Sequence, residues 1–301
     1  MSSPRVTVLM PVYNAARYLA EAVDSILAQT YRDFDFVIVN DGSTDRSQQV
    51  LERYAQRDGR IKLISRANTG IVGALNDGLA ECRGEYVARM DADDIAMPDR
   101  LAVQLQFMDR HPEVVAYGSR VIGIDPYGCE LFRSEHKADH EAIDAELLNG
   151  VGWAIVHPAA VLRREAVEAV GRYRQQFQWV EDLDLFLRLS ERGQLANAEA
   201  FLLNYRQHTE SVNRTRAAEQ ARLADAAVRD AYARRGRPVP HGWKFVPKPR
   251  PAKEAQLRTW AWKAMKAGNV PAARKHAVAL WKVAPLSVES WRTLLCAMRG
   301  Y

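Results

Sequence analysis

The sequence has few cysteines, and they are not clustered. The three, Cys82, Cys129 and Cys296, are odd in number and far apart among 301 residues. This spacing excludes a disulfide framework and a cysteine-based zinc site, and it is typical of a reducing compartment. Long hydrophobic runs are also missing, since the apolar stretch at residues 6–12 is too short for a signal-peptide core and contains Pro11. We therefore expect a cytoplasmic protein without a membrane span.

Acidic residues are scarce in the last part of the chain. Residues 214–301 contain 19 Lys or Arg and 5 Asp or Glu, whereas residues 1–213 contain 23 and 32. The formal net charge of +5 therefore hides an acidic main part and a basic tail. A basic surface attracts nucleic acid, an anionic membrane or an acidic protein, and the charge count does not choose among them.

The sequence does contain a repeated strand and helix pattern. Hydrophobic residues make up 48% of the chain, which is enough for a full core. Apolar runs predict buried strands at residues 5–10, 34–39, 61–65 and 86–90, and a segment with helical spacing follows each of the first three. Successive units of this kind predict a Rossmann-like, doubly wound α/β sheet that is mainly parallel.

Between residues 98 and 214 the pattern predicts helices and strands in mixed order. Short strands are expected at 114–118 and 121–124, an extended segment at 154–162 and an amphipathic helix at 181–192. This second half does not repeat the first, so we expect it to receive a second substrate.

The C-terminal part has a helical pattern from about residue 215. A linker at residues 236–251 contains five prolines and separates this helix from three further short helices. Residues 268–285 resemble one tetratricopeptide-like turn and helix, so we expect a small all-helical extension. The predicted domains are a main domain at 1–214 with halves 1–97 and 98–214, a helix and linker at 215–252, and the extension at 253–301.

Three aspartates lie directly after the fourth predicted strand. Asp91, Asp93 and Asp94 follow residues 86–90, and an open α/β sheet places its ligands at the carboxyl ends of strands. A shared divalent cation relieves the repulsion among such carboxylates, whose oxygens suit Mg²⁺ and Mn²⁺. The alternative is a turn in which the aspartate side chains only cap the loop.

Polar motifs follow all four predicted strands, and in a parallel sheet they meet at one edge. They are PVYN at 11–14, NDGSTD at 40–45, RANTG at 66–70 and DADD at 91–94. Together, at these spacings, they resemble the motifs of the GT-A glycosyltransferases of inverting family 2, over residues 4–215. The resemblance implies a GT-A fold that binds a sugar nucleotide at this edge and transfers the sugar.

The resemblance implies a donor site and a divalent metal ion, Mn²⁺ or Mg²⁺. Asp93 is the first expected metal ligand, with Asp91 and His208 as further ligands, and the metal would neutralise the departing diphosphate. An aromatic ring stacks on a base, and a carboxylate accepts a hydrogen bond from its edge. The residues expected at the nucleotide sugar are Pro11 and Tyr13 beside the base, Asp41 at its ring imide, Asn68 and Gly70 in the adjoining loop, Asp91 at the ribose and Arg206 at the diphosphate.

The motif WVED at residues 179–182 resembles the acceptor site of the same family. An inverting transfer needs a carboxylate that takes the proton from the acceptor hydroxyl, and Asp182 is expected to be this base. The alternative is that Asp182 and its acidic neighbours only favour a helix N-terminus. The residues expected at the acceptor are Trp153, His157, Trp179 and Glu181.

These residues predict transfer of a sugar from a nucleoside diphosphate donor, with UDP expected, to a hydroxyl of a glycan or lipid-linked acceptor. The resemblance implies a role in surface polysaccharide synthesis. A sugar-phosphate nucleotidyltransferase would need a glycine-rich basic loop after the first strand, and residues 11–17 do not form one. The non-enzymatic alternative is a nucleotide-binding scaffold that acts through its basic tail, and the presence of Asp93 and Asp182 disfavours it.

Tryptophans interleave with Lys and Arg in the tail, and two interpretations stay open. The mixture fits peripheral contact with an anionic membrane. Alternatively, the indoles form the core of a helical cap whose basic residues face solvent. No specific nucleic-acid partner is expected. The tryptophans are Trp243, Trp260, Trp262, Trp281 and Trp291.

Overall fold

A computed structural model describes the chain at residues 4–208, 217–245 and 251–300, and the chain forms two compact units. The second unit includes a hairpin from the middle of the sequence. The predicted boundaries at residues 214 and 252 divide the chain only in sequence order, so they place this hairpin in the main domain. The first unit contains Met1–Val121, Glu135–Asn204 and Arg216–Val246; the second contains Ile122–Ser134, Tyr205–Thr215 and Pro247–Tyr301.

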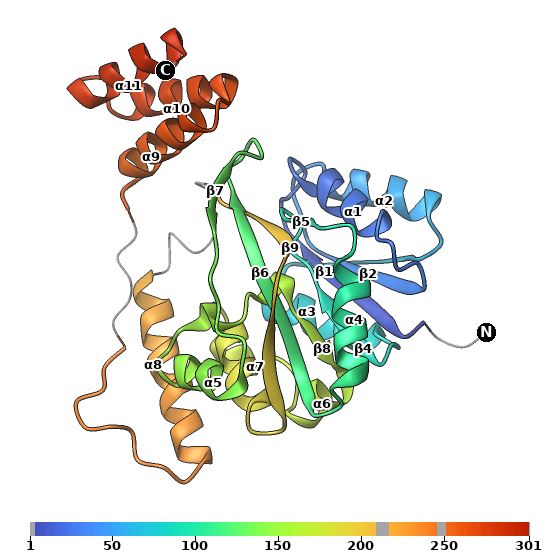
Figure 1. Cartoon of the computed structure of the whole chain (residues 1–301). Helices are drawn as coiled ribbons and strands as arrows, with labels where there is room; N and C mark the ends of the chain where they lie inside the picture. Colours follow the sequence, from blue (N-terminus) through green and yellow to red (C-terminus); the bar gives the residue numbers. More distant parts are fainter. Residues whose placement is uncertain (1–3, 209–216, 246–250, 301) are drawn as a thin grey trace. The chain divides into compact units, whose positions relative to one another are not determined.

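Four parallel strands form the N-terminal part of the sheet, as predicted (Figure 1). They are β1 (Val6–Val12), β2 (Phe34–Asp41), β3 (Ile61–Arg66) and β4 (Tyr86–Arg89), in the order β3-β2-β1-β4. Every residue of β1 and β4 is buried, which explains why these strands are apolar without alternation. Their carboxyl ends form the edge to which the sequence motifs belong.

Strand β1 is longer than the sequence predicts, because Pro11 does not end it. Pro11 lies opposite Val39 of β2, and the strand continues to Val12. On the other side the ladder with β4 ends at Leu9 and Arg89. Proline lacks a backbone donor, and at this position the pairing with β4 has already ended.

The helices between these strands are α1 (Leu19–Leu27), α2 (Ser47–Arg57) and α3 (Ile71–Glu81), with α4 (Arg100–Arg110) after β4. On α1 the buried residues recur at the predicted helical spacing, so one apolar face packs on the sheet. They are Leu19, Ala22, Val23 and Ile26.

The remaining strands make the sheet mixed. Val114–Ile124 is one continuous strand, β6, instead of the two that were predicted, and it runs beside β9 (Gln194–Arg206) in Figure 1. The predicted extended segment at 154–162 consists of two 3₁₀ turns and the short strand β8 (Val161–Arg163), which pairs antiparallel with β4. The order is β3-β2-β1-β4-β8-β6-β9-β5, where β5 is Ile95–Ala96.

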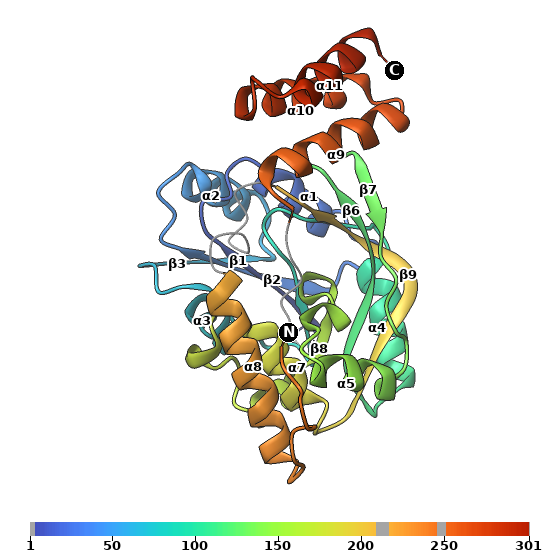
Figure 2. The ribbon, with the colours of Figure 1, turned by 90° about the vertical axis from the view of Figure 1, so that its left-hand side faces the viewer.

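Further helices of the first unit cover the mixed part. Figure 2 shows α8 beside α7, and the two helices are in contact. The predicted helix at 181–192 is α7, which ends earlier than predicted, at Leu189. These helices are α5 (His140–Leu148), α6 (Arg164–Ala169), α7 (Glu181–Leu189) and α8 (Ala217–Arg234).

The second unit contains the three predicted C-terminal helices, α9 (Lys253–Lys266), α10 (Val270–Val283) and α11 (Val288–Arg299). Small alanines and Cys129 form one part of its core, and Trp260 with Leu131 forms another. His276 of α10 pairs at 2.5 Å with Asp125, at the turn between β6 and β7 (Glu130–Arg133). Within the described ranges, every helix is too short or too polar to cross a membrane.

Candidate active site

The three aspartates after β4 form a compact acidic cluster. One carboxylate oxygen from each of Asp91, Asp93 and Asp94 lies within 4.8 Å of the others. Asp94 is buried and acts on the buried Arg100, which donates to the carbonyl of Arg89 at 2.7 Å. Asp94 therefore lies within electrostatic reach of this buried guanidinium, while the partly exposed Asp91 and Asp93 offer the hard oxygen ligands that suit Mg²⁺ or Mn²⁺.

Arg89, at the end of β4, is a site residue that the sequence analysis did not identify. Its side chain is 3% exposed and forms an ion pair with Asp91. Its positive charge also opposes the rise in pKa that burial gives Glu181 and Asp182, and it acts on Tyr173. A charged residue within a buried apolar strand was the signal available in the sequence, because such a charge needs a partner.

The loops after β1 and β2 are joined by Asn14. Its side-chain oxygen accepts the backbone N–H of Thr44 at 2.8 Å, while its backbone N–H donates to Ser43 Oγ at 3.0 Å. Pro11 is buried in β1, but the neighbouring Tyr13 is 53% exposed. The fixed loop therefore presents an exposed aromatic ring at the carboxyl edge of the sheet.

Asp41, at the end of β2, holds the loop after β3. Its two carboxylate oxygens accept the backbone N–H groups of Thr69 at 3.1 Å and Gly70 at 2.9 Å. Asn68 donates from its amide to the Asp41 carbonyl at 2.9 Å. Gly70 has φ of 91°, and a Cβ there would lie 2.6 Å from Gln178 Nε2. Glycine is thus required, and this loop touches the segment that precedes α7.

A pair of hydrogen bonds also ties α3 to the second half of the first unit. Asn76 donates to the carbonyl of Tyr173 at 2.8 Å and accepts from its backbone N–H at 3.1 Å. Sequence reasoning gave neither residue a role. Together with the contact between Gly70 and Gln178, this clamp fixes the start of α7 against the loops of the parallel strands.

Glu181 and Asp182 begin α7 in a partly buried position. Glu181 Oε2 accepts the backbone N–H of Trp179 at 2.8 Å, and Asp182 Oδ1 accepts that of Leu183 at 2.8 Å. Burial first, and then the charge of Asp182, raises the pKa of Glu181 to about 7. Burial also raises the pKa of Asp182, and the charge of Asp91 adds to this. Asp182 is therefore within electrostatic reach of the acidic cluster.

Trp179 and Trp153 lie near these carboxylates. Trp179 has φ of 84°, a backbone conformation that a bulky residue seldom adopts and that clusters at functional sites. Trp153 belongs to the 3₁₀ turn Gly152–Ala154, and a Cβ on Gly152 would lie 4.0 Å from Asp182 Oδ1. Trp153 is partly exposed, so an aromatic surface is available beside the turn.

His157 is buried behind the site. Its Nε2 lies 2.7 Å from the hydroxyl of Tyr173. Burial, together with the charge of Arg89, lowers the pKa of His157 well below its usual value. The structure therefore places a neutral imidazole under the site, where it supports Tyr173, and does not expose it to an acceptor.

Arg206 and His208 belong to the second compact unit. Arg206 ends β9 and is buried, and the next residue, Gln207, donates its backbone N–H to Ile124 at 2.8 Å. The predicted contacts of Arg206 with a diphosphate and of His208 with a metal stay predictions. Ser211 and Arg214, which follow Arg206 and His208 in the sequence, lie outside the described residues.

The sequence is similar to curated bacterial glycosyltransferases. It is 33% identical over 196 residues to the putative glycosyltransferase EpsE of Bacillus subtilis, covering 64% of this chain and 69% of EpsE. It is 32% identical over 215 residues to the amylovoran biosynthesis glycosyltransferase AmsE of Erwinia amylovora, covering 70% and 79%. The matched stretch thus spans roughly two thirds or more of each relative.

Solved structures share the fold at low identity. The S. aureus TarS 1-349 complex with UDP aligns with a TM-score of 0.57 and 15% identity, covering 99% of this chain and 92% of that one. The mannosyltransferase PcManGT of Pyrobaculum calidifontis, in complex with GDP-Man and Mn²⁺, aligns with a TM-score of 0.56 and 19% identity, covering 99% and 81%. The family model described as glycosyl transferase family 2 matches residues 7–171. The chain is a glycosyltransferase that belongs to glycosyl transferase family 2.

Proposed function

We propose that this glycosyltransferase moves a sugar from a UDP-linked donor to a hydroxyl of a glycan or lipid-linked acceptor, with inversion and with Mn²⁺ or Mg²⁺ at Asp91 and Asp93. The carrying observation is that two groups of carboxylates, Asp91 with Asp93 and Asp182 with Glu181, are brought into electrostatic reach around the buried Arg89. A one-step inverting transfer needs a base on one side of the sugar and charge compensation on the other.

In the proposed reaction Asp182 takes the proton of the acceptor hydroxyl. The acceptor oxygen forms its bond to the anomeric carbon as the bond from that carbon to the diphosphate oxygen breaks, and the nucleoside diphosphate leaves with the electron pair. The divalent cation, when bound, neutralises the charge that develops on this leaving group. The carboxylate of Asp182 is already held by the Leu183 N–H, so the base is oriented before the acceptor arrives.

The donor nucleotide has a platform at the edge of β1 and β2. Tyr13 offers an exposed ring for stacking on the base, and the Asp41 carboxylate lies beside it at the end of β2. Asp41 Oδ1 accepts the Thr69 N–H and also lies 3.4 Å from Arg66 Nε, while Oδ2 accepts only the Gly70 N–H among the hydrogen bonds described and keeps a lone pair for a base N–H. The TarS structures contain UDP and UDP-GlcNAc, and that of PcManGT contains GDP-Man. UDP is our choice because Asp41 would accept from a uracil imide.

The acceptor side would be formed by Trp153, Trp179 and Glu181, with His157 acting from beneath. The relative AmsE is named for amylovoran biosynthesis, and we propose a place in extracellular polysaccharide assembly for this chain as well. A lipid-linked acceptor would be presented at a membrane surface, and we assign contact with that surface to the basic C-terminal segment.

A thermal-shift experiment tests the donor site directly. The full chain is melted with UDP, GDP or buffer alone, with and without Mn²⁺. Stabilisation by UDP that requires Mn²⁺ is the expected result, since a ligand that binds only the folded state raises its stability. A larger shift with GDP would replace UDP in the proposal, and equal UDP shifts with and without metal would contradict the metal site.

A further inference from the structure

Helix α11 has its amphipathic faces reversed. The residues that it buries are small or polar, namely Ser290, Thr293 and Ala297. The opposite face carries Val288, Trp291, Leu295 and Met298, at the spacing of one helical stripe, and each is at least 47% exposed. A helix normally buries its large apolar residues. The exposed apolar face of α11 is therefore available to a partner outside the second unit.

The exposed apolar surface continues into the turn before α11. Leu286 is almost fully exposed and Val283, at the end of α10, is half exposed. We call Val283, Leu286, Val288, Trp291, Leu295 and Met298 the α11 stripe. Trp291 is held in place by its Nε1, which donates to the Pro285 carbonyl at 2.8 Å, and by a T-shaped contact with Trp281. Ordered exposed apolar side chains of this number usually mark an interaction site.

Positive charge borders the stripe. Arg292 and Arg299 follow Val288 and Leu295 by four residues each and therefore lie along one side of it. Arg292 forms a long, exposed ion pair with Glu289, at 3.7 Å. Residues 251–300 contain nine Lys or Arg and two acidic residues.

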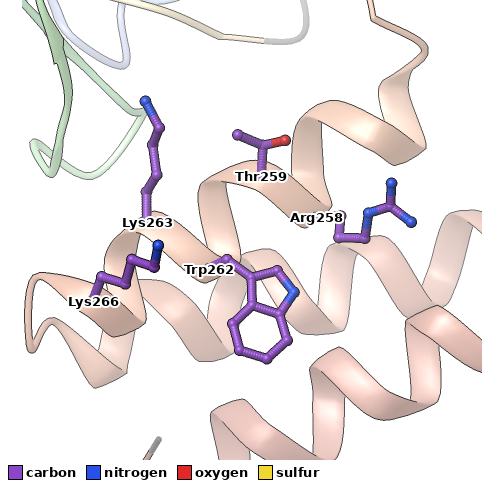
Figure 3. A pocket seen from close by; sticks show the side chains of 5 residues that line it. All are labelled: Arg258, Thr259, Trp262, Lys263 and Lys266. Carbon is purple, nitrogen blue, oxygen red and sulfur yellow. The ribbon is translucent and has the colours of Figure 1, made fainter.

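Helix α9 adds further cations, as Figure 3 shows. Arg258, Trp262 and Lys266 line a hollow of about 280 Å³, and Lys263 reaches from it to the carbonyl of Leu131. Among the described residues, Arg258 and Lys266 form no ion pair with a carboxylate. No acidic side chain lines this hollow. Its cations strengthen the attraction of the unit for anions.

We propose that the α11 stripe is a docking surface for an anionic lipid bilayer. Helices with an apolar face and flanking Arg or Lys lie in the bilayer interface, with indoles at headgroup level. Each basic residue near an anionic surface adds to the attraction. Docking at a bilayer would give the enzyme access to a lipid-linked acceptor, and only this role of the surface rests on the proposed function.

A bilayer fits the stripe better than a second copy of the chain does. A stable protein interface buries about 800 Å² on each partner, and the six exposed side chains of the α11 stripe offer less. A two-fold contact would also bring Arg292 and Arg299 toward like charges of the other copy. Nucleic acid would pair with the cations but would leave the apolar side chains in water.

Vesicle flotation with the full chain tests the proposal. We expect binding to vesicles of phosphatidylcholine with phosphatidylglycerol, and much weaker binding to phosphatidylcholine alone. The double variant Leu295→Ser/Met298→Ser should bind roughly ten- to a hundredfold more weakly, because two half-exposed apolar side chains no longer enter the bilayer. Arg292→Gln/Arg299→Gln should lose roughly tenfold on the anionic vesicles only.

The matched control is Cys296→Ser, which lies on the same helix but off the stripe, and which should bind as the unchanged protein does. All variants are checked for an unchanged melting temperature, since the substituted positions are not in the core. Undiminished binding by the Leu295→Ser/Met298→Ser variant would overturn the proposal. A dimer that this variant abolishes, without any vesicle binding, would assign the stripe to a second copy. The UDP thermal shift is read separately, so failure of the donor site does not affect this outcome.

Discussion

Arg89 and Asp91, two residues apart at the end of β4, form an ion pair of unequal exposure. The guanidinium is 3% exposed, while the carboxylate keeps 32% of its side chain exposed. The cation is therefore fixed inside the protein, and the anion reaches the site. Leaving a buried charge without its partner costs free energy of folding, so the ion pair with Arg89 fixes the position of the Asp91 carboxylate. The same cation acts on Glu181 and Asp182 and links the two halves of the site.

Replacing Arg89 by methionine should shift the pH dependence of transfer. Because the charge of Arg89 lowers the pKa of Asp182, its removal raises that pKa, and the base becomes protonated at higher pH. The acid limb of the kcat/KM profile should therefore move to higher pH. Arg89→Lys keeps the charge and should restore most of the original profile. An unchanged acid limb in a folded Arg89→Met variant would argue against electrostatic coupling.

Asp182→Asn should abolish transfer while the donor still binds. Loss of a general base typically costs a factor of about 10² to 10⁴ in kcat, and the amide cannot take the acceptor proton. The measurement is turnover with a sugar nucleotide, beside the UDP thermal shift. Glu181→Gln is the comparison, since its carboxylate accepts from Trp179, and it should lose much less activity. The reverse ranking would make Glu181 the base.

Asp93→Asn should remove the metal-dependent part of the UDP thermal shift. A neutral amide oxygen is a weaker ligand for a hard divalent cation than a carboxylate is. The matched control is Asp99→Asn, an exposed acidic residue nearby that makes no capping hydrogen bond at the start of α4. We expect the control to keep the full shift. Equal shifts in both variants would place the metal elsewhere.

Glu181 should make folding less stable at alkaline pH in the protein without ligands. Its pKa rises from 4.5 in the unfolded chain to about 7 in the fold. Between these values the folded protein holds the additional proton, so stability decreases as pH rises through this window. Glu181→Gln should therefore gain roughly 1 to 2 kcal/mol at about pH 8 and little at about pH 4, after allowance for solvent screening. Urea unfolding at both pH values measures this, and a gain that is independent of pH would contradict it.

Asp184 should be structural although it lies beside the proposed base. It is buried and pairs with Arg174 and, at 2.6 Å, with Arg188. Asp184→Asn leaves the buried Arg188 without its carboxylate partner, although Arg174 keeps Asp230 at 2.6 Å, and it should cost about 3 to 5 kcal/mol in the free energy of unfolding. Asp225→Asn breaks the more exposed pair with Arg229 and should cost much less, because solvent screens that pair. Similar costs for both variants would show that burial does not strengthen the Asp184 network.

The sequence by itself determined the parallel half of the fold and the position of its motifs. Strands β1, β2 and β4 are buried almost throughout, so each is an apolar run that local pattern reveals, while β3 is more exposed. Because parallel strands present their carboxyl ends at one edge, Asp41 and Asp91 were predicted on a common edge without coordinates. The three C-terminal helices were predictable for a similar reason, since helical spacing is local.

Tertiary structure decided how these pieces combine. The action of the Arg89 charge on Asp182, the clamp between Asn76 and Tyr173, and the burial of His157 depend on how segments distant in the chain pack together. The sequence of α11 also does not show that its large apolar face is the exposed one. Spacing shows that a helix has a large apolar stripe, but only the packing of its neighbours determines whether that stripe points inward. Burial and pairing are properties of the assembled chain, and local pattern does not encode them.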